Sequence, residues 1–284
     1  MVFHQNVVIF ARKIRQAMGL WQNITLGRYY PSGSIIHRLD PRTKLILSLG
    51  MMLTIMLVDS WPALLLWTFV LIVAILVTHI PLHIFVRNLR AFLWLFGITI
   101  FLHALTSSAA PDVEMWGISI SGAGALIGVK YALRLGLLVL VAALLTSTTI
   151  PADLTDGLER MLHPLERIKF PAHELALMTM MALRFVPTII EEAQRIQRAQ
   201  ISRGARFDGH LLQRVHALIP MLVPLFISTF KRADELAAAM EARCYRGGEG
   251  RVSFRELKLA RADWIAIGIM LAAGLLTWPL TVQS

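Results

Sequence analysis

The chain has 284 residues, of which 56% are hydrophobic and 16% charged, and its mean hydropathy is +0.62. This composition excludes a soluble globular domain, because so much apolar surface cannot be hidden from water in a chain of this length. The formal net charge is +10, but apolar stretches separate the basic ones. That pattern is typical of the cytoplasmic Lys/Arg excess of membrane proteins and argues against nucleic acid as a partner. The single cysteine, Cys244, excludes an intrachain disulfide framework and a cysteine-based zinc site.

The N-terminal segment, residues 1–44, is predicted to be cytoplasmic. It holds seven Lys or Arg residues against one acidic residue, Asp40, which the positive-inside rule assigns to the cytoplasm. No apolar core of the signal-peptide type precedes residue 45, so we expect no cleaved leader.

Residues 45–150 contain four apolar stretches that we interpret as transmembrane helices. The first two are shorter than the roughly 20 residues of a straight span, so they need flanking residues or a thinned bilayer. The segment Asp59-Ser60-Trp61-Pro62 separates these two stretches. It predicts that the first helix ends here and that a second helix begins with Pro62 in its first turn. The four stretches are 45–58, 63–78, 91–110 and 125–150.

The loops between these stretches give one consistent orientation. The predicted loop at 79–90 carries two arginines and is expected inside, whereas 111–124 carries two acidic residues without Lys or Arg and is expected outside. Lys130 and Arg134 lie four residues apart near the outer end of the fourth span. They either reach the outer headgroups or face the bundle interior as a buried pair.

Residues 151–260 predict a cytoplasmic domain of helices delimited by prolines. One helix begins at Asp153, a second runs from Pro171 to about Ser202, and a third runs from near His210 to about Tyr245. Their apolar parts are expected to lie along the membrane face or to pack on each other.

A last span is predicted at 264–280, within residues 261–284. Trp264 and Trp278 bracket it as an aromatic belt does, and it leaves the C-terminus outside. The predicted fold class is therefore an all-α membrane protein, with about five transmembrane helices and a cytoplasmic domain of long helices.

The second and third cytoplasmic helices end in a repeated pattern. One end reads Ser202-Arg203-Gly204-Ala205-Arg206-Phe207, and the other reads Ala242-Arg243-Cys244-Tyr245-Arg246-Gly247. Ordinary C-capping also favours cations and glycine at a helix end. Two such ends forty residues apart indicate a duplicated docking element instead. A protruding arginine suits a partner's groove, because its guanidinium forms forked hydrogen bonds to carboxylates and carbonyls.

Together with the stretch Tyr29–Lys44, these two ends resemble the transmembrane T component of energy-coupling factor transporters, and the resemblance covers essentially the whole chain. It implies that 151–260 is a coupling domain whose tips dock into two ABC-type ATPase subunits. Arg203 and Arg243 are then the main contacts, Gly204 and Ala242 permit close approach, and Arg206 and Arg246 contribute secondary contacts. The departures are Ser202 for alanine and Cys244 for glycine. The latter leaves open whether the second helix turns at Cys244 or at Gly247-Gly248.

The resemblance further implies a non-catalytic scaffold in a prokaryotic cell membrane, with its N-terminus in the cytoplasm. Such a subunit transmits conformational change from the ATPases to a substrate-binding membrane subunit, one or several interchangeable, for vitamin uptake. It needs no cofactor or metal, because ATP and Mg²⁺ are bound by the partner subunits. A dedicated cobalt or nickel importer is the alternative within the family.

Two other classes stay open on the residues alone. A stand-alone secondary transporter needs polar groups at mid-membrane, and Lys130, Arg134 and His103 are the only candidates. A membrane enzyme or haem protein could use His79 and His83, although the proline between them disfavours a regular helix there. An ATP motor is excluded, because no Gly-x-x-x-x-Gly-Lys-Ser/Thr loop occurs.

Overall fold

The computed structural model describes residues 30–106, 113–115, 118–164, 171–205, 211–245, 247 and 259–282, and the statements below concern these residues. The chain divides into two compact units. One unit, called the bundle here, comprises Gly27–Met161 with Arg255–Ser284, and the other, called the helix pair, comprises Met1–Leu26 with Leu162–Phe254.

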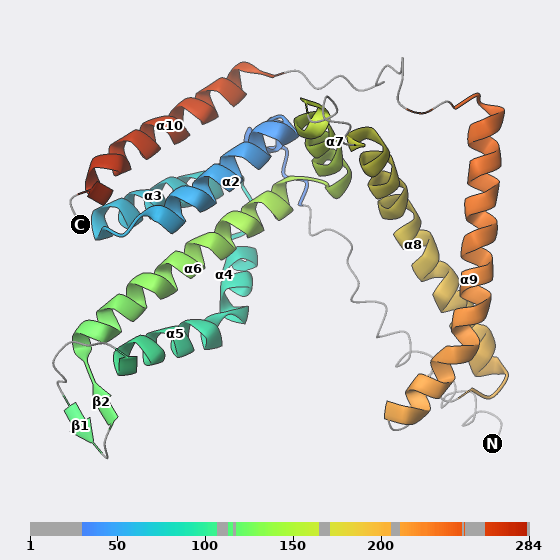
Figure 1. The fold of residues 1–284 in the computed structure, drawn as a ribbon, viewed down its shortest axis with the longest axis horizontal. Coiled ribbons are helices and arrows are strands. Elements are labelled where there is room, and N and C mark those ends of the chain that lie inside the picture. Colours follow the sequence, from blue (N-terminus) through green and yellow to red (C-terminus); the bar gives the residue numbers. More distant parts are fainter. Residues whose placement is uncertain are drawn as a thin grey trace. The chain divides into compact units, whose positions relative to one another are not determined.

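The bundle is built from helices that follow the predicted spans closely (Figure 1). The predicted break between the first two spans is confirmed, since α3 begins at Trp61 with proline in its first turn. The first span starts earlier than predicted, because Asp40 caps the helix with its carboxylate and Pro41 occupies the first position. The elements are a 3₁₀ turn η1 (Ile36–Arg38) and helices α2 (Pro41–Leu57), α3 (Trp61–Val77), α4 (Leu82–Ala91), α5 (Leu93–Thr106), α6 (Gly122–Thr148), α7 (Pro151–Leu162) and α10 (Arg261–Val282).

The prediction of an all-α membrane protein is confirmed. By length and composition, α6 and α10 can each cross a membrane, and α4 with α5 can do so as a pair bent by 51°. Helices α2 and α3 have 17 residues each and are shorter than these spans. Of the two, α3 is a shorter apolar helix, whereas a membrane crossing by α2 stays a prediction. Helix α8 of the helix pair also passes this test of length and composition.

Two predicted loops contain regular structure. The segment expected as the loop 79–90 forms α4, an amphipathic helix whose Phe85 is buried in the core. The segment 111–124 contains a short antiparallel hairpin, β1 (Val113–Met115) and β2 (Ile118–Ile120), with Glu114 opposite Ser119.

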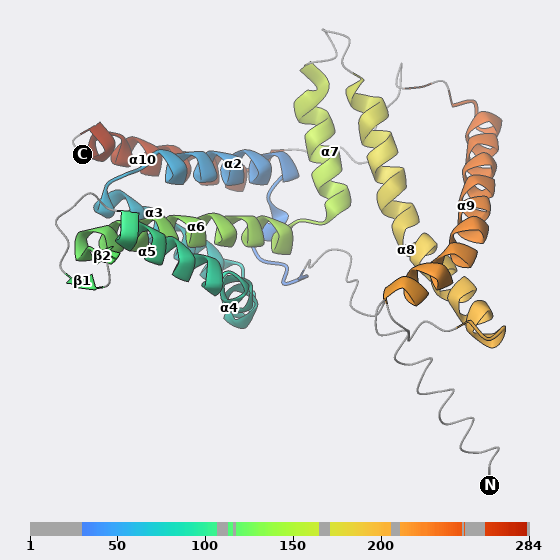
Figure 2. The same cartoon turned by 60° about the horizontal axis from the view of Figure 1, so that its bottom comes forward.

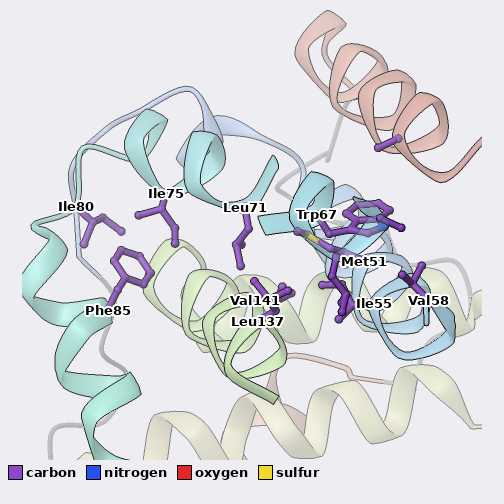
Figure 3. Packing of buried hydrophobic residues seen from close by; sticks show 13 residues of the cluster. Met51, Ile55, Val58, Trp67, Leu71, Ile75, Ile80, Phe85, Leu137 and Val141 are labelled. Atoms are coloured by element: carbon purple, nitrogen blue, oxygen red, sulfur yellow. The ribbon is translucent and has the colours of Figure 1, made fainter. Parts of the chain in front are cut away.

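The core of the bundle lies where α2, α3 and α6 meet (Figure 3). Trp67 of α3 is fully buried at its centre, and Leu71 and Ile75 continue the same face of that helix towards Phe85 of α4. The other labelled members come from α2, α6 and the connections between helices: Met51, Ile55, Val58, Ile80, Leu137 and Val141.

Helix α6 packs closely on α5 because small residues recur along one side of it. Gly124, Gly128, Ala132 and Gly136 are spaced by four and are buried or nearly so. A Cβ atom added at Gly128 would lie 2.7 Å from the Cα atom of Ile100. The backbones of the two helices therefore touch at this point, and a larger residue has no room.

The helix pair consists of α8 (Ala172–Ser202) and α9 (Leu211–Ala242), which agree with the predicted helices to within three residues at each end. Helix α8 continues through Pro187, whereas α9 changes direction in its first half, where Pro220 and Pro224 remove two backbone donors (Figure 1). On the polar part of α8, Arg195 pairs with Glu192.

Candidate docking site at two helix tips

The first tip is the C-terminal end of α8. Arg203 is the C-cap residue, and Gly204 after it has φ +90°. The amide of Gly204 donates to the carbonyl of Ile201 (3.0 Å), and the amide of Ala205 donates to the carbonyl of Gln200 (3.0 Å). These two bonds define a Schellman motif, which satisfies the last carbonyls of the helix.

The second tip, at the end of α9, has the same backbone arrangement. Cys244 donates to the carbonyl of Glu241 (2.8 Å), and Tyr245 donates to the carbonyl of Met240 (3.0 Å). Cys244 occupies the position of Gly204 and has φ +56°. The helix therefore turns at Cys244, which resolves the alternative that the sequence left open. A non-glycine residue in this conformation costs about 1–2 kcal/mol.

Both tips expose the residues that the sequence predicted for docking. Ser202, Arg203 and Gly204 are exposed at the first tip, and Ala242, Arg243 and Cys244 are exposed at the second. Among the described residues, the guanidinium groups of Arg203 and Arg243 have no hydrogen-bond or ion-pair partner. Their donors are thus available to another molecule, on a backbone that is already ordered. Arg206 and Arg246, predicted as secondary contacts, lie outside the described residues.

The two helices cross at matching positions of their sequences. A small pocket between them is lined by Phe185, Thr188, Ile189 and Glu192 of α8 and by Ser228, Thr229, Arg232 and Ala233 of α9. Three of the four residues on each helix correspond to one another forty residues apart. The tips are spaced by the same forty residues. Each tip arginine therefore follows its crossing residue, Ile189 or Thr229, by fourteen residues, or about 21 Å of helix.

The helices of the pair run in opposite directions, so the tips point away from each other (Figures 1 and 2). The hydroxyl of Tyr245, just past the end of α9, lies 3.5 Å from the Nε2 atom of His173 in the first turn of α8. The end of α9 therefore lies beside the start of α8. The arrangement is two equivalent tips on either side of one crossing.

The described part of the predicted motif, Tyr30–Lys44, has a structural role in the bundle that sequence reasoning did not assign. The Nε2 atom of His37 lies 2.9 Å from the carbonyl of Tyr30, and its Nδ1 atom lies 2.7 Å from the hydroxyl of Ser34. Burial lowers the pKa of His37, so the ring is neutral at neutral pH. Nε2 must then donate to the carbonyl, and Nδ1 accepts from the hydroxyl.

Lys44 connects this motif to the end of α6. Its buried Nζ atom donates to the carbonyls of His37 and Thr148, each at 3.0 Å. Asp263 connects the motif to α10, since its carboxylate accepts from the amide of Asp40 (2.9 Å) and from the amide of Ala260 (2.7 Å). The starts of α2 and α10 and the end of α6 are therefore joined at one end of the bundle.

The opposite end of the bundle explains Lys130 and Arg134. Arg134 donates to the carboxylate of Asp59 at 2.8 Å and to the carbonyl of Val58, and the Lys130 Nζ atom donates to the carbonyl of Asp59 at 3.0 Å. The pair thus closes the turn between α2 and α3, an arrangement that neither sequence alternative included. The guanidinium of Arg134 lowers the pKa of Asp59.

The three histidines that the sequence analysis singled out, His79, His83 and His103, do not converge. His103 stacks on Tyr131, with ring centroids 4.8 Å apart, whereas His79 and His83 lie at the other end of the bundle, after α3. Among the residues that the structure describes, no three His, Cys, Asp or Glu side chains come together as a metal site.

Proteins similar to this chain are known. The family described as cobalt transport protein matches residues 32–254. The energy-coupling factor transporter transmembrane protein EcfT of Ruminiclostridium cellulolyticum is 42% identical over 266 residues, which cover 92% of this chain and 98% of that protein. The proteins of the same name from Heliobacterium modesticaldum and Bacillus subtilis are 46% and 40% identical. These matches cover 86% and 90% of this chain and 92% and 98% of the two relatives.

Proposed function

This chain belongs to the family of energy-coupling factor transporter transmembrane proteins, and from that premise we propose that it couples two ATPase subunits to substrate uptake. The observation that carries the proposal is the pair of equivalent tips. Both end in a Schellman motif with an exposed arginine at the C-cap, at the same distance from the crossing of α8 and α9. Two equivalent tips suit two copies of one kind of partner.

In this function each tip inserts into a groove on one ATPase subunit. Arg203 and Arg243 donate forked hydrogen bonds to carboxylates or carbonyls of the groove. When ATP binding or hydrolysis brings the ATPases together or apart, the tips follow, and the change reaches the crossing through two continuous helices. ATP and Mg²⁺ stay on the partner subunits, and the chain itself is not a catalyst.

A separate membrane subunit carries the substrate in this proposal. Helix α9 exposes a run of large apolar side chains, of which Phe226, Ile227 and Phe230 are each at least 60% exposed. An exposed apolar patch on this helix fits a membrane-embedded partner. Exposed Met178 and Met180 on α8 suit a surface that accommodates several interchangeable subunits, because methionine side chains adapt to different shapes. The substrate class that we propose is a vitamin.

The tips and the Tyr30–Lys44 end of the bundle belong to the cytoplasmic side in this proposal, because residues 1–44 carry seven Lys or Arg residues against one acidic residue. A reporter after Ser284 is then extracytoplasmic, and a reporter inserted near Gly209 is cytoplasmic. If both reporters were found on one side of the membrane, the proposed five-span arrangement would be wrong.

Purification of the tagged chain from its native membrane tests the coupling role. We expect ATPase subunits and a substrate-binding membrane protein to accompany it. The double variant Arg203→Glu/Arg243→Glu should lose the ATPases and abolish uptake, while it still inserts into the membrane. The matched control Arg198→Glu/Lys231→Glu reverses two exposed charges in the bodies of the same helices and should keep both. Undiminished uptake by the tip variant would contradict the docking role.

A dedicated cobalt or nickel importer is the second candidate, since the matching family is described as cobalt transport protein. Uptake assays separate the two. Vitamin uptake that survives deletion of any one substrate-binding subunit supports a shared vitamin module, whereas ATP-dependent uptake of Co²⁺ or Ni²⁺ alone supports the dedicated importer.

A further inference from the structure

An open groove of about 670 Å³ lies on the bundle beside the end of α3. Its residues come from the Tyr30–Lys44 motif on one side and from the last two turns of α3 on the other. Those that the argument uses are Arg38, Val73, Leu76, Val77 and His79. A space of this size is too large for a single ion, and it can hold a headgroup together with the first part of an acyl chain.

One wall of the groove is apolar and lies on the outward face of α3. Leu71 and Ile75 of this helix face the core, whereas Leu76 is 55% exposed and Val73 and Val77 are exposed beside it. Helix α3 is apolar along its whole length, so this face is suited to lipid chains and not to water.

The opposite wall carries Ser32, Ser34 and Arg38 beside the exposed Ile35, and no acidic residue lines the groove. Arg38 is exposed, and within the described residues its guanidinium has no ion-pair or hydrogen-bond partner. His79, directly after the end of α3, is exposed too, and its φ of +54° places it at a sharp turn of the chain. Both side chains can donate hydrogen bonds to an anion. They lie at the end of an apolar helix, which is the depth at which phospholipid headgroups are found.

We propose that this groove binds an anionic phospholipid of the membrane, with its phosphate at Arg38 and His79 and an acyl chain along Val73, Leu76 and Val77. The combination favours a lipid over a free anion, because a free phosphate would leave the apolar wall unused. It also favours a lipid over a protein segment, because the groove joins headgroup depth to a lipid-facing helix surface. This site uses neither helix tip, so it is independent of the proposed ATPase docking.

Native mass spectrometry of the full chain in nanodiscs tests the proposal. The discs contain phosphatidylglycerol and phosphatidylcholine, and the measurement counts the phosphatidylglycerol that stays bound after release. Arg38→Gln should reduce this retention about fivefold, the effect of one basic residue near a charged headgroup. Leu76→Trp, which fills the apolar wall, should reduce it as well. Arg87→Gln is the matched control, since Arg87 is an exposed arginine of the neighbouring α4 that does not line the groove.

Three outcomes would overturn the proposal. Equal losses in Arg38→Gln and Arg87→Gln would mean a general attraction of anionic lipid to basic residues. Complete displacement of the lipid by inorganic phosphate would mean an anion site that needs no acyl chain. If no variant changed lipid retention but Arg38→Gln alone lost a co-purifying membrane protein, the groove would be a protein interface.

Discussion

Lys44 of the bundle and the two tip arginines of the helix pair, Arg203 and Arg243, are used in opposite ways. Lys44 is only 7% exposed and donates to two backbone carbonyls from different parts of the chain. Arg203 and Arg243 are exposed at the ends of α8 and α9, and within the described residues their guanidinium groups have no hydrogen-bond or ion-pair partner. A basic side chain that donates its hydrogen bonds within the protein stabilises the fold. A basic side chain at an ordered, exposed helix tip can instead donate its hydrogen bonds to a partner protein. The same contrast can be tested by separating effects on unfolding from effects on binding.

The largest effect is expected at the tips, and only on binding. Arg203→Glu or Arg243→Glu should weaken ATPase docking by about 2–5 kcal/mol each, the range for a charged anchor buried in an interface. The free energy of unfolding should change by less than about 0.5 kcal/mol, as for other exposed sites. Affinity for the ATPases and thermal unfolding in detergent measure the two quantities. If a tip variant unfolds at a clearly lower temperature than the wild type, the tip arginines also stabilise the fold, and the contrast with Lys44 is wrong.

Lys44→Met should have the reverse profile. It leaves the buried carbonyls of His37 and Thr148 without their donor, at a cost of about 3 kcal/mol in unfolding free energy. ATPase affinity of the folded fraction should not change. Lys231→Met is the control, since Lys231 is exposed on α9. If both variants unfold at the same temperature, Lys44 does not join α2 to α6 in the way that the hydrogen bonds indicate.

One glycine of each unit extends the comparison. The bundle needs Gly128 for close packing, whereas the helix pair needs Gly204 for its backbone conformation. Gly128→Ala should cost about 2 kcal/mol, since its Cβ would press on the backbone of Ile100 in α5. Gly204→Ala should cost about 1 kcal/mol, because there is open space around it and only its φ of +90° opposes a side chain. Thermal unfolding of the two variants gives both values. If both variants lost the same unfolding free energy, the two glycines would not differ in the physical reason for which they are needed.

Cys244→Gly should stabilise the chain by about 1 kcal/mol, because glycine adopts the left-handed conformation without strain. Uptake should be preserved. Cys244 is exposed in the described structure, so it should react with a water-soluble maleimide in the isolated chain. Bound ATPases should slow that reaction by covering the tip. Equal labelling with and without the ATPases would place Cys244 outside the interface.

The smallest effect is expected at Asp59, which is itself largely exposed although Arg134 is not. Asp59→Asn should cost about 0.5 kcal/mol, since solvent screens an ion pair at such a position. Because the folded state lowers the pKa of Asp59, this contribution is complete above the ordinary aspartate pKa of 3.8 and is lost as the pH falls below it. Unfolding midpoints of the wild type and Asp59→Asn should therefore converge on acidification. A constant difference down to low pH would assign the effect to the backbone of the turn.

Much of the helical pattern could be predicted because its signals are local. Pro62 marked the start of α3, and Pro171 preceded α8 by one residue. Residues 79–90 were predicted as a loop because their two arginines dominated the charge pattern. They form α4 because Phe85 is buried in the bundle core, a contact that only tertiary packing provides.

The sequence by itself determined the class of the protein, the order of its helices and the identity of the tip residues, because hydropathy, proline and charge act over a few neighbouring positions. Tertiary structure alone decided what the buried polar residues do. Lys44 meets Thr148, and Asp40 meets Asp263, across more than a hundred residues of chain. It also decided that α9 turns at Cys244, since a β-carbon disfavours that conformation locally. The hydrogen bonds that hold it there, from Cys244 to Glu241 and from Tyr245 to Met240, form only on the completed last turn of the helix.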